Sequence, residues 1–213
     1  MSLKIKLCGM RRPEDIEYIN SFPPDYAGFI LSPGFRRSID RETFLRLVSL
    51  LRSSISPVGV FVDEPIENVV EFAPKLSVIQ LHGGENEEYI RRLRGLIPAD
   101  CEIWKAVRVK SEDDILKADR LPADKLLLDA FSENSVGGTG KTADWDLIGK
   151  TRISKPFFAA GGITAANFRE AAERLSPYGI DLSGGIETGG AKDLLKIREI
   201  MQKKAEFEKT KGY

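Results

Sequence analysis

Eight short apolar runs, each followed by an amphipathic segment, most restrict the fold of this 213-residue chain. The runs are rich in Val, Ile, Leu and Phe, and their largely continuous apolarity is typical of parallel strands covered on both faces. They occupy residues 4–8, 27–31, 57–62, 78–81, 103–107, 125–129, 156–160 and 180–183.

The segments between the runs have helical periodicity. Phe44, Leu47, Val48 and Leu51, for example, form a one-sided apolar stripe. The predicted helices cover residues 14–21, 41–53, 67–74, 86–96, 112–118, 145–149, 165–175 and 194–203. Strict strand–helix alternation predicts a parallel sheet, and eight pairs in this length favour a closed (β/α)₈ TIM barrel of the α/β class.

We predict a single domain spanning residues 1–213, with a charged helix end that frays after Lys203. The competing architecture is an open, doubly wound sheet. That fold usually has fewer strands and a G-x-G-x-x-G fingerprint after its first strand. Here the first run ends in Cys8-Gly9-Met10-Arg11, which lacks the fingerprint.

Charge and composition exclude several classes of function. Lys+Arg and Asp+Glu both number 32, so a balanced surface predicts neither a nucleic-acid partner nor an anionic membrane partner. No apolar run is long enough to span a membrane, and the first ten residues lack the apolar segment of a signal peptide. Two cysteines make no disulfide framework, so we expect a cytoplasmic protein with reduced thiols.

In a (β/α)₈ barrel, functional groups gather at the carboxyl ends of the strands. Cys8 ends the first run and Asp129 ends the sixth, which makes them candidates for acid–base chemistry. The alternatives are a small buried thiol and a carboxylate that caps a helix or joins an ion pair. Cys101 precedes the fifth run, so we interpret it as structural, at the opposite rim.

Two glycine pairs follow adjacent runs, Gly161-Gly162 after the seventh and Gly184-Gly185 after the eighth. Glycines let backbone amides approach an anion, and these two loops form the recurrent phosphate site of barrels. Residues 135–142 resemble the phosphate-binding G-x-x-x-x-G-K-[ST] loop, but Ser135 replaces its first glycine. A loop that closes over the site is the preferred interpretation of that segment.

His82 is the chain's only histidine, so neither a Ser-His-Asp triad nor a multi-histidine metal site is possible. His82 follows the fourth run. It either lines the site or serves as a structural histidine, and we predict no metal ligands.

The residues at these strand ends, in order, resemble the motifs of one enzyme family, phosphoribosylanthranilate isomerase of tryptophan biosynthesis. Each motif alone is weak evidence for the family. Together the motifs occur in the family's order and register, and they cover nearly the whole chain. The matching segments are Lys6-Leu7-Cys8-Gly9-Met10, Gly28-Phe29, the Ser-Pro…Arg-Arg stretch 32–37, Val58-Gly59-Val60-Phe61-Val62, Gln80-Leu81-His82-Gly83, Lys105-Ala106-Val107, Leu127-Leu128-Asp129 with Gly137-Gly138-Thr139-Gly140, Ala160-Gly161-Gly162-Ile163 and Asp181-Leu182-Ser183-Gly184-Gly185-Ile186-Glu187.

The resemblance implies an Amadori rearrangement of N-(5-phosphoribosyl)anthranilate to 1-(2-carboxyphenylamino)-1-deoxyribulose 5-phosphate, with no metal or organic cofactor. It implies that Asp129 is the general acid and Cys8 the general base. It further implies that Arg37 pairs with the anthranilate carboxylate and that His82 and Asp181 bind substrate.

By the same resemblance, the amides around Gly161, Gly162, Gly184 and Gly185 hold the phosphate. The chain departs from the family at Gly184 and Ala160, where serine is common, and this puts phosphate affinity in question. We expect a small phosphoribosyl substrate as the partner, and a monomer or a homodimer.

Two alternatives stay open. A histidine-pathway sugar-phosphate isomerase normally has an aspartate at the end of the first strand, where this chain has Cys8. A non-catalytic barrel that binds a phosphorylated ligand needs the same loops but no acid–base pair. A pentulose-phosphate epimerase is disfavoured because it needs several metal-binding histidines.

Overall fold

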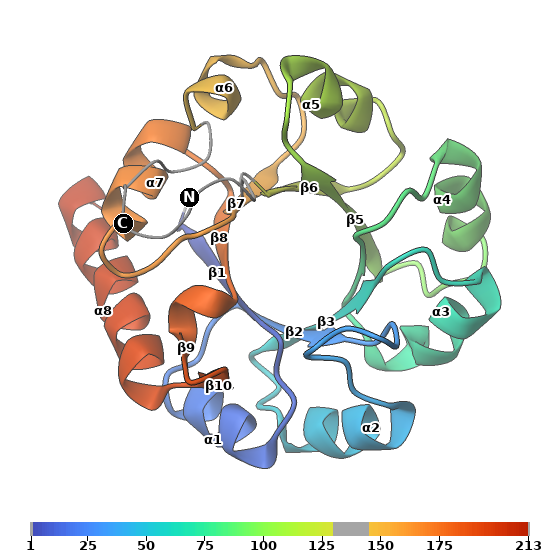
Figure 1. Cartoon of the computed structure of the whole chain (residues 1–213), viewed down its shortest axis with the longest axis horizontal. Coiled ribbons are helices and arrows are strands. Elements are labelled where there is room, and N and C mark those ends of the chain that lie inside the picture. The colour runs from blue at the N-terminus through green and yellow to red at the C-terminus, as the bar shows by residue number, and fades with distance from the viewer. Residues whose placement is uncertain (1, 130–144, 213) are drawn as a thin grey trace.

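The computed structural model describes residues 2–129 and 145–212, and within them eight parallel strands close into a barrel in sequence order. Viewed down the barrel, the strands form a ring and the helices stand around its outside (Figure 1). The predicted (β/α)₈ fold is confirmed. The strands are β1 Lys4–Cys8, β2 Tyr26–Ile30, β3 Ser56–Phe61, β4 Val78–Leu81, β5 Glu102–Arg108, β6 Lys125–Asp129, β7 Phe157–Ala160 and β8 Gly179–Leu182.

A helix follows each strand, and several of these helices begin at a side-chain cap. Asp40, Asn86 and Asp193 each accept a hydrogen bond from a backbone N–H of the first turn that follows. The helices are α1 Pro13–Ser21, α2 Arg41–Leu50, α3 Ile66–Phe72, α4 Glu87–Arg94, α5 Glu112–Asp119, α6 Trp145–Lys150, α7 Phe168–Leu175 and α8 Leu194–Lys211. In the part of the chain that the structure describes, none of these helices is long and apolar enough to cross a membrane.

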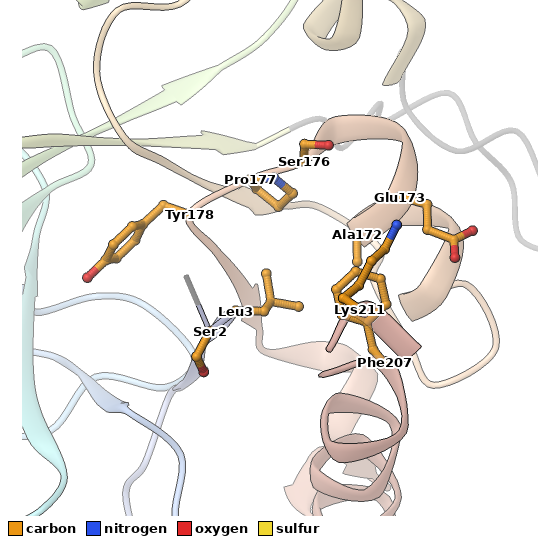
Figure 2. A pocket seen from close by; sticks show the side chains of 9 residues that line it. All are labelled: Ser2, Leu3, Ala172, Glu173, Ser176, Pro177, Tyr178, Phe207 and Lys211. Atoms are coloured by element: carbon orange, nitrogen blue, oxygen red, sulfur yellow. The ribbon is translucent and has the colours of Figure 1, made fainter. Parts of the chain in front are cut away.

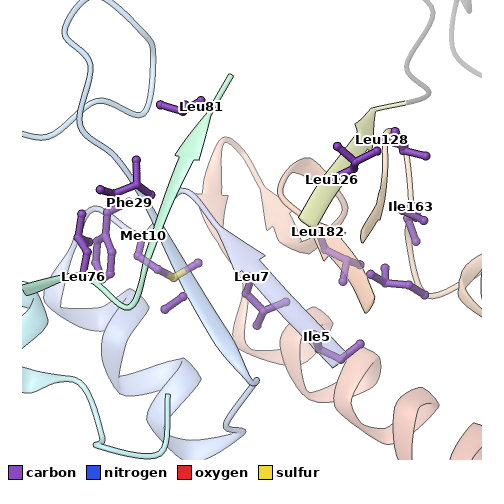
Figure 3. Packing of buried hydrophobic residues seen from close by; sticks show 14 of the residues in the cluster. Ile5, Leu7, Met10, Phe29, Leu76, Leu81, Leu126, Leu128, Ile163 and Leu182 are labelled. Carbon is purple, nitrogen blue, oxygen red and sulfur yellow. The ribbon is translucent and has the colours of Figure 1, made fainter. Parts of the chain in front are cut away.

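The apolar residues pack in two clusters because successive strand residues face opposite sides of the sheet. Leu126 and Leu128 belong to the larger cluster, between strands and helices (Figure 3). Leu127, between them in sequence, belongs to the smaller cluster inside the barrel. Every strand therefore presents alternate side chains to the interior, which is the geometry that brings functional groups from different strands together.

Aromatic side chains fill the amino-terminal end of the barrel interior. Trp104 and Phe158 stack with ring centroids 4.5 Å apart, and Tyr26 meets both rings edge-on. Lys125 lies over the Trp104 ring and pairs with both carboxylate oxygens of Glu102 at 2.6 Å. The barrel interior is thus packed with aromatic rings at its amino-terminal end.

The observed strand ends lie within one residue of the predicted ones, whereas helix ends differ more. The sequence predicts that the last helix frays after Lys203, but α8 continues to Lys211. Phe207 is buried on this extension, and Lys204 pairs with Asp25 at 2.9 Å. These tertiary contacts therefore stabilise the end of α8, which its charged sequence alone would not keep helical. The short strands β9 Glu187–Thr188 and β10 Ala191–Lys192 were also not predicted.

We predict that Phe158→Ala lowers the free energy of unfolding by about 3–5 kcal/mol, because it removes a fully buried ring from the barrel interior. Urea denaturation followed by circular dichroism measures this change. Leu195→Ala is the control, because Leu195 is 61% exposed, and it should shift stability by less than about 0.5 kcal/mol. Equal effects of the two substitutions would contradict the described packing.

Candidate active site

A cavity of about 610 Å³ opens at the carboxyl ends of the strands. Interior-facing side chains of several strands and the loops after β7 and β8 line it. All the site residues predicted from the sequence lie on its wall: Cys8, Arg37, His82, Asp129, Gly161, Gly162, Asp181, Gly184 and Gly185. The fold therefore gathers into one cavity residues that are spread over most of the chain.

Cys8 and Asp129 are the last residues of β1 and β6, and both face this cavity. The Cys8 side chain is almost fully buried, with 7% of the residue exposed. Gly28 pairs with Cys8 across the sheet, and a methyl group on Gly28 would lie 2.7 Å from the Cys8 Sγ atom. The glycine at that position thus leaves room for the thiol.

A buried ion pair joins β1 to β8 at the cavity wall. Lys6 Nζ contacts Asp181 Oδ1 at 2.8 Å, with side-chain exposures of 0% and 9%. The two residues are direct partners in the β1–β8 register. Burial alone would lower the pKa of Lys6, but the charges of Asp181 and Cys8 outweigh burial, and the pKa is raised. Lys6 is therefore a cation inside the barrel.

His82 lies between charged neighbours but is neutral near pH 7. Burial lowers its pKa, and this effect exceeds the opposing attraction of Asp129. Gln80 Nε2 and His82 Nδ1 are 2.8 Å apart. If Gln80 donates this hydrogen bond, the proton of neutral His82 is on Nε2. Gln80 is 1% exposed, and among the described residues its Oε1 has no hydrogen-bond partner.

Arg37 is held at the rim by a carboxylate. Its Nε and Nη2 atoms donate to Glu187 at 2.6 and 2.9 Å, and Glu187 also accepts from Lys192 and Arg36 at 2.9 Å. Burial alone would raise the pKa of Glu187, but these hydrogen bonds and cations hold it far below its usual range. The Glu187 carboxylate thus fixes the position of Arg37. Because it is surrounded by the cations of Arg36, Arg37 and Lys192, this group of side chains stays net positive.

The two glycine loops meet at one side of the cavity. Gly161 and Gly162 have φ angles of +91° and +66°, a backbone region that favours glycine. Asn167 braces this loop, because it accepts from the Thr164 N–H at 2.8 Å and donates to the Gly162 carbonyl at 3.1 Å. Gly185, in the loop after β8, packs directly against the Ile163 backbone carbonyl in the loop after β7. Closely packed glycine backbones can present amides to an anion.

Sequence reasoning missed several residues of this site. Gln80, Thr164 and Ser183 also line the cavity, and Lys6 pairs with Asp181 on its wall. A usable signal existed, because Lys6 and Gln80 each stand two residues before a predicted site residue and so face the same side of the strand. Lys192 gave no such signal, since it reaches the site through the unpredicted strand β10.

Two other sequence predictions fall outside the cavity. Cys101 precedes β5 at the opposite end of the barrel, and burial raises the pKa of its thiol to about 11. This position agrees with a structural thiol. The segment 135–142, interpreted as a closing loop, lies outside the described residues.

A smaller cavity of about 380 Å³ lies between the ends of α7 and α8 and the start of β1 (Figure 2). Its walls include Leu3, Tyr178 and Phe207, and none of the predicted site residues. Leu3 and Tyr178 precede β1 and β8, so this cavity is at the other end of the strands from Cys8.

Comparison with known proteins gives a consistent match. The family model described as N-(5′-phosphoribosyl)anthranilate (PRA) isomerase matches residues 5–203. The N-(5′-phosphoribosyl)anthranilate isomerase of Endomicrobium trichonymphae is 46% identical over 201 residues, 93% of this chain and 96% of that protein. The crystal structure of phosphoribosyl anthranilate isomerase from Thermotoga maritima is 31% identical, with a TM-score of 0.84 over 96% of this chain and 99% of that one.

A further crystal structure shows a phosphoribosyl anthranilate isomerase in complex with reduced 1-(o-carboxyphenylamino)-1-deoxyribulose 5-phosphate. It is 28% identical to this chain, with a TM-score of 0.81, and the match covers 96% of this chain and 99% of that one. These matches extend over nearly the whole of both partners.

We predict that Gly185→Ala is destabilising by about 1–3 kcal/mol, because its methyl group would overlap the Ile163 backbone carbonyl. Gly184→Ala is the neighbouring control. The atom nearest to its methyl group would be Arg37 Nη2, 3.9 Å away on a flexible side chain. Urea unfolding measures the effect of both substitutions, and a Gly184→Ala variant less stable than Gly185→Ala would contradict the described loop contact.

Proposed function

This chain belongs to the N-(5′-phosphoribosyl)anthranilate isomerase family, and from that premise we propose that it catalyses the Amadori rearrangement of N-(5′-phosphoribosyl)anthranilate. The product is 1-(2-carboxyphenylamino)-1-deoxyribulose 5-phosphate. The single observation that supports this most directly is the shared cavity of Cys8 and Asp129, which brings a thiol and a carboxyl from distant strands to one substrate-sized space.

In the proposed reaction, Asp129 acts as the general acid and donates a proton to the ribose ring oxygen. The C1–O bond then breaks, and the nitrogen lone pair forms a protonated Schiff base with C1. That positive charge acidifies the proton on C2, and the Cys8 thiolate removes it. The C–H electron pair forms the aminoenol, which becomes the ketone as C1 takes up a proton and the C2 hydroxyl group releases one. These steps need two proton-transfer groups and neither a metal nor an organic cofactor.

Substrate binding is assigned to the remaining cavity residues. The glycine loops at Gly161-Gly162 and Gly184-Gly185 contribute amides to the phosphate, at the place where barrels commonly bind one. Arg37, oriented by Glu187, pairs with the anthranilate carboxylate. Neutral His82 and the Asp181 carboxyl group offer hydrogen-bond partners to the ribose hydroxyls.

We further propose a cellular compartment, a class of partner and an oligomeric state for this protein. Both thiols are free, which agrees with a reducing cytoplasmic compartment. The balanced charge of the chain supports a small-molecule partner instead of nucleic acid or a membrane. The protein is proposed to act as a monomer or a homodimer, which sedimentation velocity distinguishes.

We predict that Cys8→Ser and Asp129→Asn each lower kcat about 10²- to 10⁴-fold, because each removes one positioned proton transfer. The assay follows the disappearance of N-(5′-phosphoribosyl)anthranilate with purified protein. Cys101→Ser is the matched control, since that thiol is buried at the opposite end of the barrel, and it should leave kcat unchanged.

Full turnover in both site variants would refute the assigned roles. A wild-type protein that binds a phosphorylated ligand without converting the phosphoribosyl anthranilate would instead favour the binding barrel. Conversion of a histidine-pathway substrate in preference to this one would favour the other isomerase.

A further inference from the structure

Gln80 and His82 are two polar side chains of the cavity wall that contact each other. They stand two residues apart at the carboxyl end of β4, so both project from the same side of the sheet, and both line the cavity. Gln80 Nε2 lies 2.8 Å from His82 Nδ1, a distance typical of a hydrogen bond. Because Nδ1 is engaged by Gln80, Nε2 is the ring nitrogen that remains for a ligand.

The backbone around His82 is held independently of this contact. The His82 N–H donates to the Phe61 carbonyl at 2.7 Å, which continues the β3–β4 ladder past the end of the strand. Lys105 Nζ donates to the carbonyl of the next residue, Gly83, at 2.6 Å. With the backbone fixed on both sides, His82 retains only the rotation of its side chain, and the Gln80 amide group restrains that rotation.

The direction of the hydrogen bond decides which ring nitrogen carries the proton. Burial lowers the pKa of His82, so near pH 7 the neutral ring has one N–H group and one nitrogen lone pair. If the Gln80 amide group donates to Nδ1, the proton of His82 is on Nε2. If the Gln80 carbonyl oxygen accepts instead, the proton is on Nδ1.

The burial of Gln80 favours donation by its amide group. Gln80 is 1% exposed, and its Oε1 has no hydrogen-bond partner among the described residues. When the amide group donates, a carbonyl oxygen occupies this unpartnered position. A reversed side chain would place both N–H groups of Nε2 there instead. Buried N–H groups without a partner are rarer in proteins than carbonyl oxygens without one, so donation to Nδ1 costs less.

The charged groups around His82 act in the same direction. The carboxyl groups of Asp129 and Asp181 favour a proton on the ring, whereas Lys6 and Lys105 disfavour one. Asp129 and Asp181 both line the cavity, and Lys6 is itself paired with Asp181 at 2.8 Å. The carboxyl groups of the cavity wall thus add to the preference for a proton on Nε2, the nitrogen turned away from Gln80.

We propose that Gln80 is a positioning residue that keeps the proton of His82 on Nε2, so that His82 acts toward the substrate as a hydrogen-bond donor. The inference rests on the proposed function, in which His82 binds an oxygen of the ribose. A ring held in this way presents an N–H group to that oxygen. A ring that turned over or changed its tautomer would present a lone pair instead, and it would lose the hydrogen bond.

The test observes the tautomer directly, without substrate. His82 is the only histidine of the chain, so nitrogen NMR of ¹⁵N-labelled protein prepared without a histidine tag reports on this ring alone. Couplings to the ring C–H protons identify each nitrogen, and its chemical shift distinguishes an N–H group from a lone pair. Near pH 7 we expect a protonated Nε2 and an unprotonated Nδ1. A protonated Nδ1 would overturn the proposal.

The main variant is Gln80→Met, because methionine has a similar length and no N–H group to donate. We expect Nδ1 to gain a share of the proton, so that the shifts of the two nitrogens move toward each other. Gln80→Leu replaces this variant if it does not fold, with the same expected result. An unchanged nitrogen pattern in the variant would contradict the role of Gln80.

Val60→Ala is the matched control. Val60 is the direct partner of Gln80 in the β3–β4 register and lines the same cavity, but its aliphatic side chain forms no hydrogen bond. Val60→Ala should therefore retain the nitrogen pattern of the parent protein. If it changes the pattern as much as Gln80→Met does, general loosening of the barrel explains both changes and the proposal fails.

Turnover of N-(5′-phosphoribosyl)anthranilate is measured in parallel. Gln80→Met should lower kcat/KM about tenfold, which corresponds to the loss of about one hydrogen bond. In a His82→Phe background the same substitution should change kcat/KM less than about twofold, because Gln80 then has no imidazole to position. An equal loss in both backgrounds would show that Gln80 acts independently of His82. A parent protein without turnover refutes the proposed function, while the nitrogen pattern still decides the role of Gln80.

Discussion

Closure of the sheet by the pairing of β1 with β8 is the constraint on which the rest of this structure depends. The register of that pairing sets Lys6 beside Asp181 and completes a barrel in which every strand points the same way. Because all strands are parallel, their carboxyl ends share one mouth. Cys8 at the end of the first strand and Asp129 at the end of the sixth can therefore face a common cavity.

The interior is divided along its axis by the size and polarity of the side chains. Trp104 and Phe158 stack against each other at the amino-terminal end. Toward the other end the cavity begins, and polar residues such as Gln80 and His82 join apolar ones such as Val60 and Leu127 on its wall. Charged groups are costly at such depth unless they are paired, and the observed ones are, as Lys6 with Asp181 and Lys192 with Glu187 illustrate.

The loops around the mouth are held by specific contacts and not by bulk packing. Glu187 binds Arg37 through two hydrogen bonds, and Asn167 braces the loop after β7 through two more. Such contacts fix the orientation of binding groups before a substrate arrives, which lowers the cost of ordering them on binding. Close approach of the Ile163 backbone explains why a residue without a side chain is required at Gly185, where the two loops touch.

The sequence by itself determined the strands, their order and the end of each strand that carries chemistry, because strand periodicity and the turn glycines are local properties. It identified Cys8 and Asp129 for the same reason. Only the tertiary structure decided which charged groups pair around the cavity. That Lys6 meets Asp181, and that Lys192 arrives from a short hairpin after β8, depends on inter-strand register and on loop paths. Those are set by contacts between residues far apart in the chain, which no local pattern records.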